Sequence, residues 1–365
     1  QMNMSQCDTF CFVHVAPIMD YGEYKTKPIQ HSLEKLRSLG IMPNMLVIRT
    51  PGELSEETIA KLELFSNIPR DNIIQNTNVK NIYYVPELFK TQKIVEKISK
   101  ILNLQYKDYE LTNYNKILNY FDTCDRIVNL GIVGKYLNTP DTYLSIIRAI
   151  ECAGIELNIK VNIDWLNPES CLSNDNMDKL QKYNGFIIPG GFGSRGIKGK
   201  MKVTEYCRIN KIPILGICLG MQIMVVDCYN SLGHIGTSTE WDHLTTMDPI
   251  IDILPNQTGI MGGTMRLGNY ETHLTNTSKV YSLYNEDVII ERHRHRYEVN
   301  NKYIDVVESS GLKFVGYSIV NDKKLMEIVE LDDHPFYVGC QYHPEFNSKY
   351  NKPNPLFVGL IKSMA

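Results

Sequence analysis

The spacing of apolar positions divides the first hundred residues into short apolar runs and longer segments with a helical period. Three runs are short enough for buried strands: residues 9–15, 45–49 and 73–76. Three segments repeat apolar side chains at helical spacing: residues 31–39, 55–65 and 86–103. Ser55 is the expected N-cap of its helix. Strands that alternate with helices indicate a parallel sheet covered by helices, so the predicted fold class is α/β.

A polar, tyrosine-rich stretch without clean periodicity interrupts this pattern at residues 104–125. The alternation of strands and helices then resumes at Ile127. We therefore expect one domain over residues 1–110, a linker over 111–125 and a second domain over 126–365.

The second domain continues the alternation and then changes character. Four buried strands are predicted: residues 127–133, 158–163, 185–191 and 212–217. Thr139, Pro140 and Asp141 have the order of an N-cap, a first helical position and a first-turn acid, which predicts a helix start. Residues 245–345 are richer in strand signals, so we expect more β structure there.

Composition and charge narrow the classes of protein that fit. The chain has 365 residues, 43% hydrophobic and 22% charged, as is ordinary for a globular protein. Its net charge of −3 argues against a nucleic-acid partner bound by bulk electrostatics. No apolar run reaches the length of a membrane span and no signal-peptide pattern is visible, so no membrane partner is expected. The cysteines have no CxxC spacing, which favours a reducing, cytoplasmic setting over a disulfide framework or a zinc site.

The most informative stretch is IPILGICLGMQ at residues 212–222. A buried strand runs into Cys218, with Gly216 and Gly220 on either side, and a helical pattern follows. Small flanking residues allow the tight strand-to-helix turn that presents a nucleophile in hydrolases. The dipole and free N–H groups of the helix N-terminus would favour a reactive thiolate. A buried structural cysteine is the alternative, and the flanking glycines favour catalysis over it.

A partner for Cys218 is present in GCQYHPEF at residues 339–346, where an apolar strand ends. His343 and Glu345 are two positions apart, so an extended backbone would place both side chains on one side. A carboxylate there holds the imidazole in the tautomer that accepts a proton from the thiol. We therefore expect Cys218, His343 and Glu345 to form a catalytic set, although His343 and Glu345 alone would fit a protein surface.

A glycine-rich segment, IIPGGFGSRGIKGK, occupies residues 187–200. Gly190, Gly191 and Gly193 leave the backbone free to offer N–H groups to a developing oxyanion. A phosphate-cradling loop is the rival interpretation, but the segment lacks the GxxxxGK[ST] spacing.

Taken in order, PGGFG, GICLGMQ and YHPEF resemble the motifs of class I glutamine amidotransferase domains. STEWD at 238–242, GTMRLG at 263–268 and ERHRHRYEVN at 291–300 are similar to the CTP synthase family in particular. The resemblance covers residues 126–365 nearly end to end. It implies a flavodoxin-like domain with a mixed sheet flanked by helices, which hydrolyses L-glutamine to glutamate and ammonia through a γ-glutamyl thioester.

The resemblance also implies binding roles. The backbone of Gly191 and Leu219 would hold the oxyanion. The residues implied in glutamine binding are Gly191, Leu219, Gly220, Met221, Gln222, Glu240 and Arg296. By charge, Glu240 suits the α-ammonium group and Arg296 the α-carboxylate.

The likeness continues upstream, where GEYKTKPIQHS at 22–32 and NIYYVPELF at 81–89 resemble the last part of the family's synthetase domain. This implies a truncated, Rossmann-like portion over residues 1–110 of a domain that uses ATP to join ammonia to UTP. The residues implied in UTP and CTP binding are Lys25, Thr26, Lys27, Pro28, Ile29, Gln30 and Lys61, and Val79 is implied in ATP binding. Ile29 stands where the family usually has Thr.

Roughly the first half of the family's chain, with its glycine-rich ATP segment and acidic Mg²⁺ ligands, has no counterpart in this sequence. We therefore expect these residues alone to hydrolyse glutamine without making CTP, and to hold no metal. For the full-length family enzyme the resemblance implies ATP and Mg²⁺ as cofactors and GTP as an allosteric activator. It also implies inhibition by CTP and a homotetramer that often forms filaments.

Two other functions remain open. Another class I amidotransferase or a glutamyl-peptide hydrolase would share the Cys and His motifs, but RHRHRYEVN and KTKPIQ count against it. A non-catalytic binding or regulatory module is the second, and the intact Cys218, His343 and Glu345 count against it.

Residue types alone give plainer interpretations of two segments. Lys25 and Lys27 would be solvated lysines, and Arg292, Arg294 and Arg296 would mark an exposed, charged strand. The intervening His293 and His295 suggest a metal, but no further ligand cluster accompanies them in the sequence.

Overall fold

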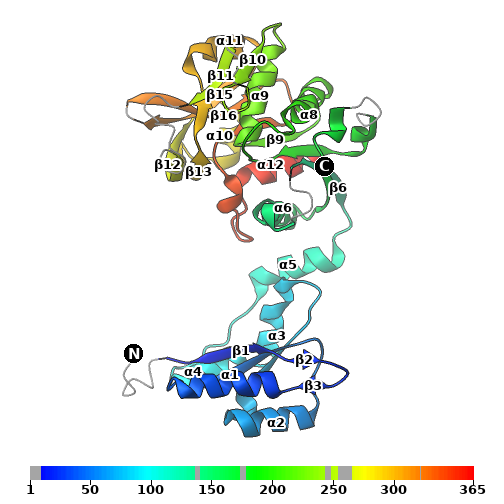
Figure 1. The fold of residues 1–365 in the computed structure, drawn as a ribbon, viewed down its shortest axis with the longest axis vertical. Helices are drawn as coiled ribbons and strands as arrows, with labels where there is room; N and C mark the ends of the chain where they lie inside the picture. The colour runs from blue at the N-terminus through cyan, green and yellow to red at the C-terminus, as the bar shows by residue number, and fades with distance from the viewer. Residues whose placement is uncertain (1–9, 136–139, 173–177, 243–247, 254–264, 321) are drawn as a thin grey trace. The chain divides into compact units, whose positions relative to one another are not determined.

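The computed structural model describes residues 10–135, 140–172, 178–242, 248–253, 265–320 and 322–365. The contacts within the chain divide it into two compact units, Gln1–Asn119 and Tyr120–Ala365 (Figure 1). The division falls inside the range for which the sequence predicted a linker. Helix α5 (Thr112–Thr123) occupies most of that range. None of the described helices is both long and apolar enough to span a membrane.

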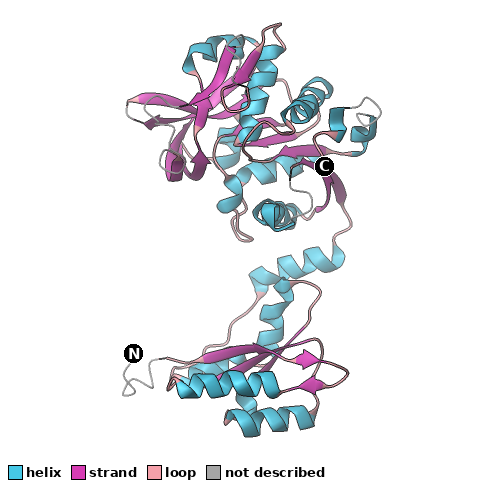
Figure 2. Cartoon of the chain, viewed as in Figure 1, coloured by secondary structure: helices cyan, strands magenta, loops and turns pink. Residues whose placement is uncertain are grey.

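The first unit is a three-stranded parallel sheet with helices on both faces, as expected of a Rossmann-like portion (Figure 2). Its strands, in spatial order, are β1 (Val13–Pro17), β4 (Met45–Thr50) and β5 (Ile73–Thr77). On β4, Leu46 and Ile48 face helices α1 (Lys27–Ser38) and α2 (Glu56–Ser66). Met45 and Val47 face the other side, where α3 (Val85–Thr91) and α4 (Ile94–Ile101) pack. A short hairpin of β2 (Met19–Asp20) and β3 (Tyr24–Lys25) precedes α1.

Two helices of this unit differ from the prediction. Helix α1 begins at Lys27 rather than His31, because Pro28 is compatible with a first helical turn. The helix predicted over residues 86–103 is broken into α3 and α4 at Lys93, whose backbone is left-handed with φ 56°. The predicted cap of α2 is confirmed, since the Ser55 side chain accepts a hydrogen bond from the Thr58 N–H at 3.3 Å.

The second unit is built on a nine-stranded mixed sheet. Its parallel part consists of β17 (Tyr337–Cys340), β9 (Ile214–Ile217), β8 (Gly185–Ile188), β6 (Ile127–Val133) and β7 (Lys160–Leu166). Its antiparallel part consists of β13 (Val288–His295), β12 (Arg266–Leu274), β15 (Leu312–Val320) and β16 (Lys323–Leu331). A separate sheet holds β10 (Gly236–Ser238), β11 (Asp248–Ile253) and β14 (Tyr297–Val299). The predicted α/β class with a mixed sheet is confirmed.

Helices cover both faces of the nine-stranded sheet (Figure 2). One face packs against α6 (Leu144–Leu157), α10 (Lys279–Tyr284) and α12 (Pro355–Met364). The other packs against α8 (Ile197–Asn210), α9 (Leu219–Asn230) and α11 (Ile304–Ser309). A short 3-10 turn, Pro140–Tyr143, leads into α6, whereas the predicted cap Thr139 lies outside the described residues.

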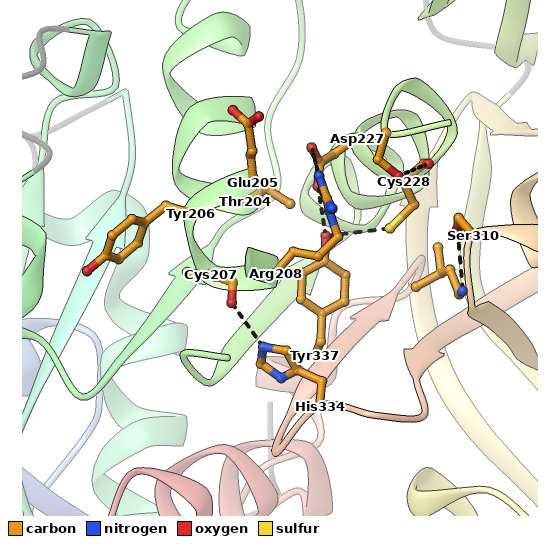
Figure 3. Close-up of polar contacts among 12 residues, drawn as sticks. Thr204, Glu205, Tyr206, Cys207, Arg208, Asp227, Cys228, Ser310, His334 and Tyr337 are labelled. Atoms are coloured by element: carbon orange, nitrogen blue, oxygen red, sulfur yellow. Dashed lines mark hydrogen bonds and ion pairs between the residues drawn. The ribbon is translucent and has the colours of Figure 1, made fainter. Parts of the chain in front are cut away.

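A partly buried ion pair ties α8 to α9. Arg208 Nε donates to Asp227 Oδ2 at 2.8 Å, and the Tyr337 hydroxyl donates to the same oxygen at 3.3 Å (Figure 3). Burial raises the pKa of Asp227 even though both partners lower it, so the pair does not fully offset the desolvation of the carboxylate. The intact pair therefore adds little net stability, but a carboxylate left alone in this place is costly.

Replacing Arg208 by methionine is expected to lower the free energy of unfolding by about 3–5 kcal/mol, because Asp227 stays buried without its cation. The matched control is Lys211→Met, which breaks a pair with the exposed Asp333 and should lower the free energy of unfolding far less, because water screens that pair. Urea denaturation of both variants measures the difference. Equal losses would show that Asp227 does not depend on Arg208.

Candidate active site

Three loops that follow neighbouring parallel strands form the site. Strands β8, β9 and β17 are adjacent in the sheet, and Ile217 of β9 lies opposite Cys340 of β17. Parallel strands end at the same edge of a sheet. This brings together Cys218 after β9, His343 after β17 and the Gly190 loop after β8, although these residues are far apart in the chain.

Cys218 occupies a strained turn between β9 and α9. Its backbone has φ 53° and ψ −103°, a conformation that costs a non-glycine residue about 1–3 kcal/mol. Two glycines permit the turn. A Cβ on Gly216 would lie 2.4 Å from Met224 Sδ, and one on Gly220 would lie 2.2 Å from the Ile188 carbonyl oxygen. The strand-to-helix turn predicted from the sequence is therefore present, and both flanking glycines are needed for close packing.

His343 connects the thiol to a carboxylate. Its Nδ1 is 2.8 Å from Glu345 Oε1, and Cys218 is close enough to raise the pKa of the ring. Because Nδ1 is bonded to Glu345, Nε2 is the ring nitrogen left to exchange a proton. Burial lowers the pKa of the imidazole, but the neighbouring Cys218 and Glu345 raise it to about 10. The site therefore favours an imidazolium at neutral pH.

The backbone around this pair differs from the prediction. Residues 343–345 are not extended, because Pro344 starts a 3-10 turn, Pro344–Phe346. His343 precedes the turn with φ −110° and ψ 86°. The contact between His343 and Glu345 therefore comes from a tight turn, and the expected strand alternation was wrong here.

Gly190 and Gly191 pass close to the nucleophile. A Cβ on Gly190 would lie 2.8 Å from His343 Cε1 and 3.5 Å from Cys218 Cβ. A Cβ on Gly191 would lie 3.5 Å from Leu219 Cδ2. A side chain at Gly190 would crowd the His343 ring, whereas one at Gly191 would only touch Leu219, so the backbone at Gly190 passes close to the catalytic pair. The two positions expected to hold an oxyanion, Gly191 and Leu219, are neighbours.

Lys135 and Glu240 hold the glycine loop from two sides. Lys135 Nζ donates to the carbonyl oxygens of Phe192 at 2.8 Å and Gly193 at 3.2 Å. Glu240 Oε1 accepts a hydrogen bond from the Gly193 N–H at 3.0 Å. Sequence reasoning missed Lys135, since a single lysine after a strand carries no motif. Its two contacts explain how a loop rich in glycine keeps one conformation.

A cavity of about 260 Å³ lies beside this loop. It is lined by Phe192, Glu240, Met265, Arg294, Arg296 and Tyr297. Arg296 Nε is buried and has no hydrogen-bond partner among the described residues. Burial raises the pKa of Glu240, while Gly193, Lys135 and Arg296 lower it. An acid and a base at one cavity match the ammonium and carboxylate groups of an amino acid.

The remaining residues predicted to bind glutamine begin helix α9: Leu219, Gly220, Met221 and Gln222. All of them are buried. Gln222 Nε2 donates to the Tyr297 carbonyl oxygen at 3.0 Å and to Gln341 Oε1 at 3.1 Å. The amide nitrogen of Gln222 is therefore engaged within the protein in this structure.

Lys200 is a buried cation that the sequence did not single out. Its side chain is 1% exposed, and Nζ is 4.0 Å from the place of a Cβ on Gly191. Burial and the nearby Lys135 lower the pKa of Lys200 to about 7, while Cys218 raises it. A partly charged ammonium thus lies beside the glycine loop.

The alternation along β13 exposes Arg292 and Arg294 and buries His293 and His295, so the predicted division onto two faces is confirmed. The expectation that no further ligand accompanies these histidines was wrong. Glu327 joins them, with one potential ligand atom from each of the three residues within 4.8 Å of the others.

Arg266 argues against a metal at this cluster. Its Nη1 donates to Glu327 Oε1 at 2.6 Å and to Glu298 Oε1 at 2.9 Å. A fixed cation already balances these carboxylates and would repel a second one. In the part of the chain that the structure describes, no other group of three potential ligands is close enough to share a metal.

The residues predicted to bind nucleotides lie around the start of α1. Lys25 ends β3 and is paired with Glu23, and Thr26, Lys27 and Pro28 begin the helix. Gln30 Nε2 donates to Thr26 Oγ1 at 3.0 Å. The Ile29 side chain is 1% exposed in the apolar core, so its difference from the family's Thr falls inside the protein.

The last two of these residues lie elsewhere in the unit. Lys61 on α2 pairs with Glu57 at 2.6 Å, and both side chains are exposed. Val79 follows β5 and is half-buried. The start of α1 is a suitable place for phosphate, because the first N–H groups of a helix favour anions.

Comparisons with known proteins agree with both units. Residues 138–363 match the family described as glutamine amidotransferase class-I, and residues 1–104 match the CTP synthase N-terminus. The chain is 42% identical to the CTP synthase of Halalkalibacterium halodurans, over 94% of this chain and 64% of that protein. It is 41% identical to the CTP synthase of Archaeoglobus fulgidus, over 99% of this chain and 68% of that protein.

One solved structure is similar to the second unit. It is the glutaminase domain of Trypanosoma brucei CTPS with bound acivicin, with a TM-score of 0.61 and 29% identity. The match covers 65% of this chain and 93% of that domain. The chain spans about two thirds of the length of the curated relatives that it matches, so the expectation that roughly half of the family's chain has no counterpart was wrong: about one third has none.

Proposed function

The chain belongs to the CTP synthase family, and from this we propose that its second unit hydrolyses glutamine and supplies the ammonia for CTP formation. The observation that carries the proposal is the arrangement of Cys218 on a strained turn with His343 and Glu345 behind it. The cavity with Glu240 and Arg296 provides a place for the amino-acid end of the substrate.

The reaction begins when the Cys218 sulfur attacks the side-chain amide carbon of glutamine. Backbone N–H groups of Gly191 and Leu219 stabilise the oxyanion. The C–N bond then breaks, and the imidazolium of His343 gives its proton to the departing ammonia. A raised pKa suits this acid step, since His343 holds a proton before the reaction.

The second half-reaction removes the acyl group. His343, now neutral, takes a proton from water, and the resulting hydroxide attacks the γ-glutamyl thioester. The C–S bond breaks, glutamate leaves and the sulfur is restored. Glu345 keeps the imidazole in one orientation through both steps, because it binds Nδ1 and leaves Nε2 for the proton.

Arg296→Ala is expected to raise the KM for glutamine by roughly ten- to a hundredfold with little change in kcat, because a charge-assisted hydrogen bond to a carboxylate is worth roughly 1.5–3 kcal/mol. Steady-state glutamate formation measures both constants. Arg292→Ala is the matched control, since Arg292 is exposed on β13 and does not line the cavity. An unchanged KM with a lower kcat would assign Arg296 a different role.

For the whole reaction, we propose that ammonia reaches UTP that ATP has activated, which gives CTP. The match of residues 1–104 to the CTP synthase N-terminus supports this proposal. Lys25, Lys27 and the start of α1 would bind phosphates of UTP or CTP, with Lys61 and Val79 near the nucleotides. No described residues of the first unit form a group that fits Mg²⁺, so no step through that ion is derived from this chain.

We also propose that the regulation, assembly and location of the protein are those of the CTP synthase family. GTP would activate the glutaminase, CTP would inhibit synthesis, and the full-length enzyme would form a homotetramer and filaments. All the described cysteines carry free thiols, which supports a cytoplasmic location. CTP formation from UTP, ATP and glutamine by the natural full-length protein tests the whole proposal, and glutamate formation without any CTP would restrict it to the glutaminase.

A further inference from the structure

Gln341 brings its side-chain amide to the sulfur of Cys218. Its Nε2 donates to Cys218 Sγ at 3.6 Å, and the side chain is completely buried. Gln341 directly follows Cys340, whose carbonyl oxygen accepts the Cys218 N–H at 2.7 Å. The end of β17 and the segment after it therefore contact Cys218 through the Cys340 backbone and the Gln341 amide. The same segment also holds the imidazole of His343. The hydrolysis steps derived above make no use of the amide.

A second amide determines which end of Gln341 faces the sulfur. Gln222 Nε2 donates to the Tyr297 carbonyl oxygen and to Gln341 Oε1. An amide nitrogen carries two hydrogens, and these two bonds use both of them. Gln341 must therefore turn its oxygen to Gln222 and its nitrogen to Cys218. The Gln341 N–H also donates to the Glu327 carbonyl oxygen at 2.8 Å, which fixes the backbone.

Hydrogen-bond donors around Cys218 favour negative charge on its sulfur. The Gln341 amide donates to the sulfur from the segment after β17, the His343 imidazole lies in the same segment, and the ammonium of Lys200 acts from α8. The carboxylate of Glu345 is bonded to His343 Nδ1. A neutral donor is useful here because it stays in place when His343 gives up its proton. The amide can then stabilise the sulfur when it leaves the thioester as an anion.

We propose that Gln341 is a further catalytic residue, whose amide donates to the Cys218 sulfur and stabilises the negative charge on it when the thioester breaks, and that Gln222 positions this amide. The inference rests on the proposed glutaminase reaction and adds a donor to it. It also gives Gln222 a second role, which is to orient the Gln341 amide, in addition to the glutamine binding expected of it.

The test is Gln341→Met, which keeps the length of the side chain and removes the donor. The rate of alkylation of Cys218 by iodoacetamide is followed against pH by mass spectrometry of its peptide. The midpoint of this profile is expected to rise by about one pH unit, with about a tenfold lower rate at neutral pH. In glutamine hydrolysis, kcat should fall about tenfold while KM changes less than about twofold.

Gln222→Met should shift the alkylation profile in the same direction by a smaller amount. If Gln341→Met does not fold, Gln222→Met is the variant that tests the proposal. Gln92→Met, which removes an amide bonded to the Gln75 carbonyl oxygen in the first unit, should leave the profile unchanged. A Gln341→Met profile within about 0.2 pH units of the wild type would overturn the proposal. Because alkylation needs no glutamine, a shifted profile in a protein that does not hydrolyse glutamine would support the contact and contradict the proposed function.

Discussion

Replacing Cys218 by alanine is expected to lower glutamine hydrolysis by roughly 10⁴-fold or more, which is the scale of losing the nucleophile of an acyl transfer. No other described side chain can replace it, because His343 and the glycine loop converge on this one sulfur. The fold should persist, since alanine removes a single atom from the turn. Glutamate formation from saturating glutamine measures the loss.

Cys228→Ala is the matched control for this variant. Cys228 lies on α9, the helix that Cys218 precedes, is also buried and has its hydrogen-bond partner in Tyr337, so its loss should leave kcat nearly unchanged. In the full-length protein, Cys218→Ala should still make CTP from added ammonia, because free ammonia bypasses the thioester. Glutaminase activity above about a tenth of the wild type in Cys218→Ala would exclude this nucleophile.

His343→Ala is expected to lower kcat by roughly 10²–10⁴-fold, the range for removal of a general acid and base. The variant lacks the proton that the raised pKa of His343 keeps ready for the departing ammonia. The KM should change little, because the proposed contacts of Glu240 and Arg296 are with the other end of the substrate. Steady-state and single-turnover assays separate the two constants.

His234→Ala controls for the loss of an imidazole. The His234 ring stacks on Tyr229 at the surface and has no contact with the site, so this variant should keep kcat within about twofold. If His343→Ala and His234→Ala were equally active, the acid and base would have to be another group, and Lys200 would be the next candidate by its burial and position.

The sequence predicts the surroundings of Cys218 well, because close packing there restricts which residue types can occupy the motif positions. Gly216 and Gly220 surround Cys218 since any Cβ there would collide with Met224 or with the backbone of β8. Glu240 and Arg296 were assigned by resemblance and charge, and the structure brings both to one cavity. Short motifs carry such information because each position has a single compatible residue type.

Other parts of the site could not be read from the sequence, because they depend on contacts between distant segments. Gln341, Lys135 and Lys200 are single polar residues, and only the order of the strands brings them to Cys218 or to its glycine loop. Glu327 was not predicted as a neighbour of the two histidines for the same reason, since it approaches His293 from a different strand. Burial of a polar side chain has no local signature in the chain.

The elements were predicted more reliably than their ends. The helix over residues 86–103 was expected to be continuous, but Lys93 adopts a left-handed backbone and divides it. Pro28 lies in the first turn of a helix where the sequence predicted a polar loop. Pro344 begins a 3-10 turn where the sequence predicted an extended segment. Proline fixes φ near the helical value, so these positions follow its own preference rather than the hydrophobic period.

The most direct test of the account is to map the adduct of 6-diazo-5-oxo-L-norleucine, an electrophilic glutamine analogue, on the intact protein by mass spectrometry. We predict one adduct per chain, on the peptide that contains Cys218, with protection by glutamine and no adduct in Cys218→Ala. The other described cysteines, most of them buried, serve as internal references. An adduct on a different cysteine, or glutamine hydrolysis that continues while Cys218 is fully modified, would contradict the account.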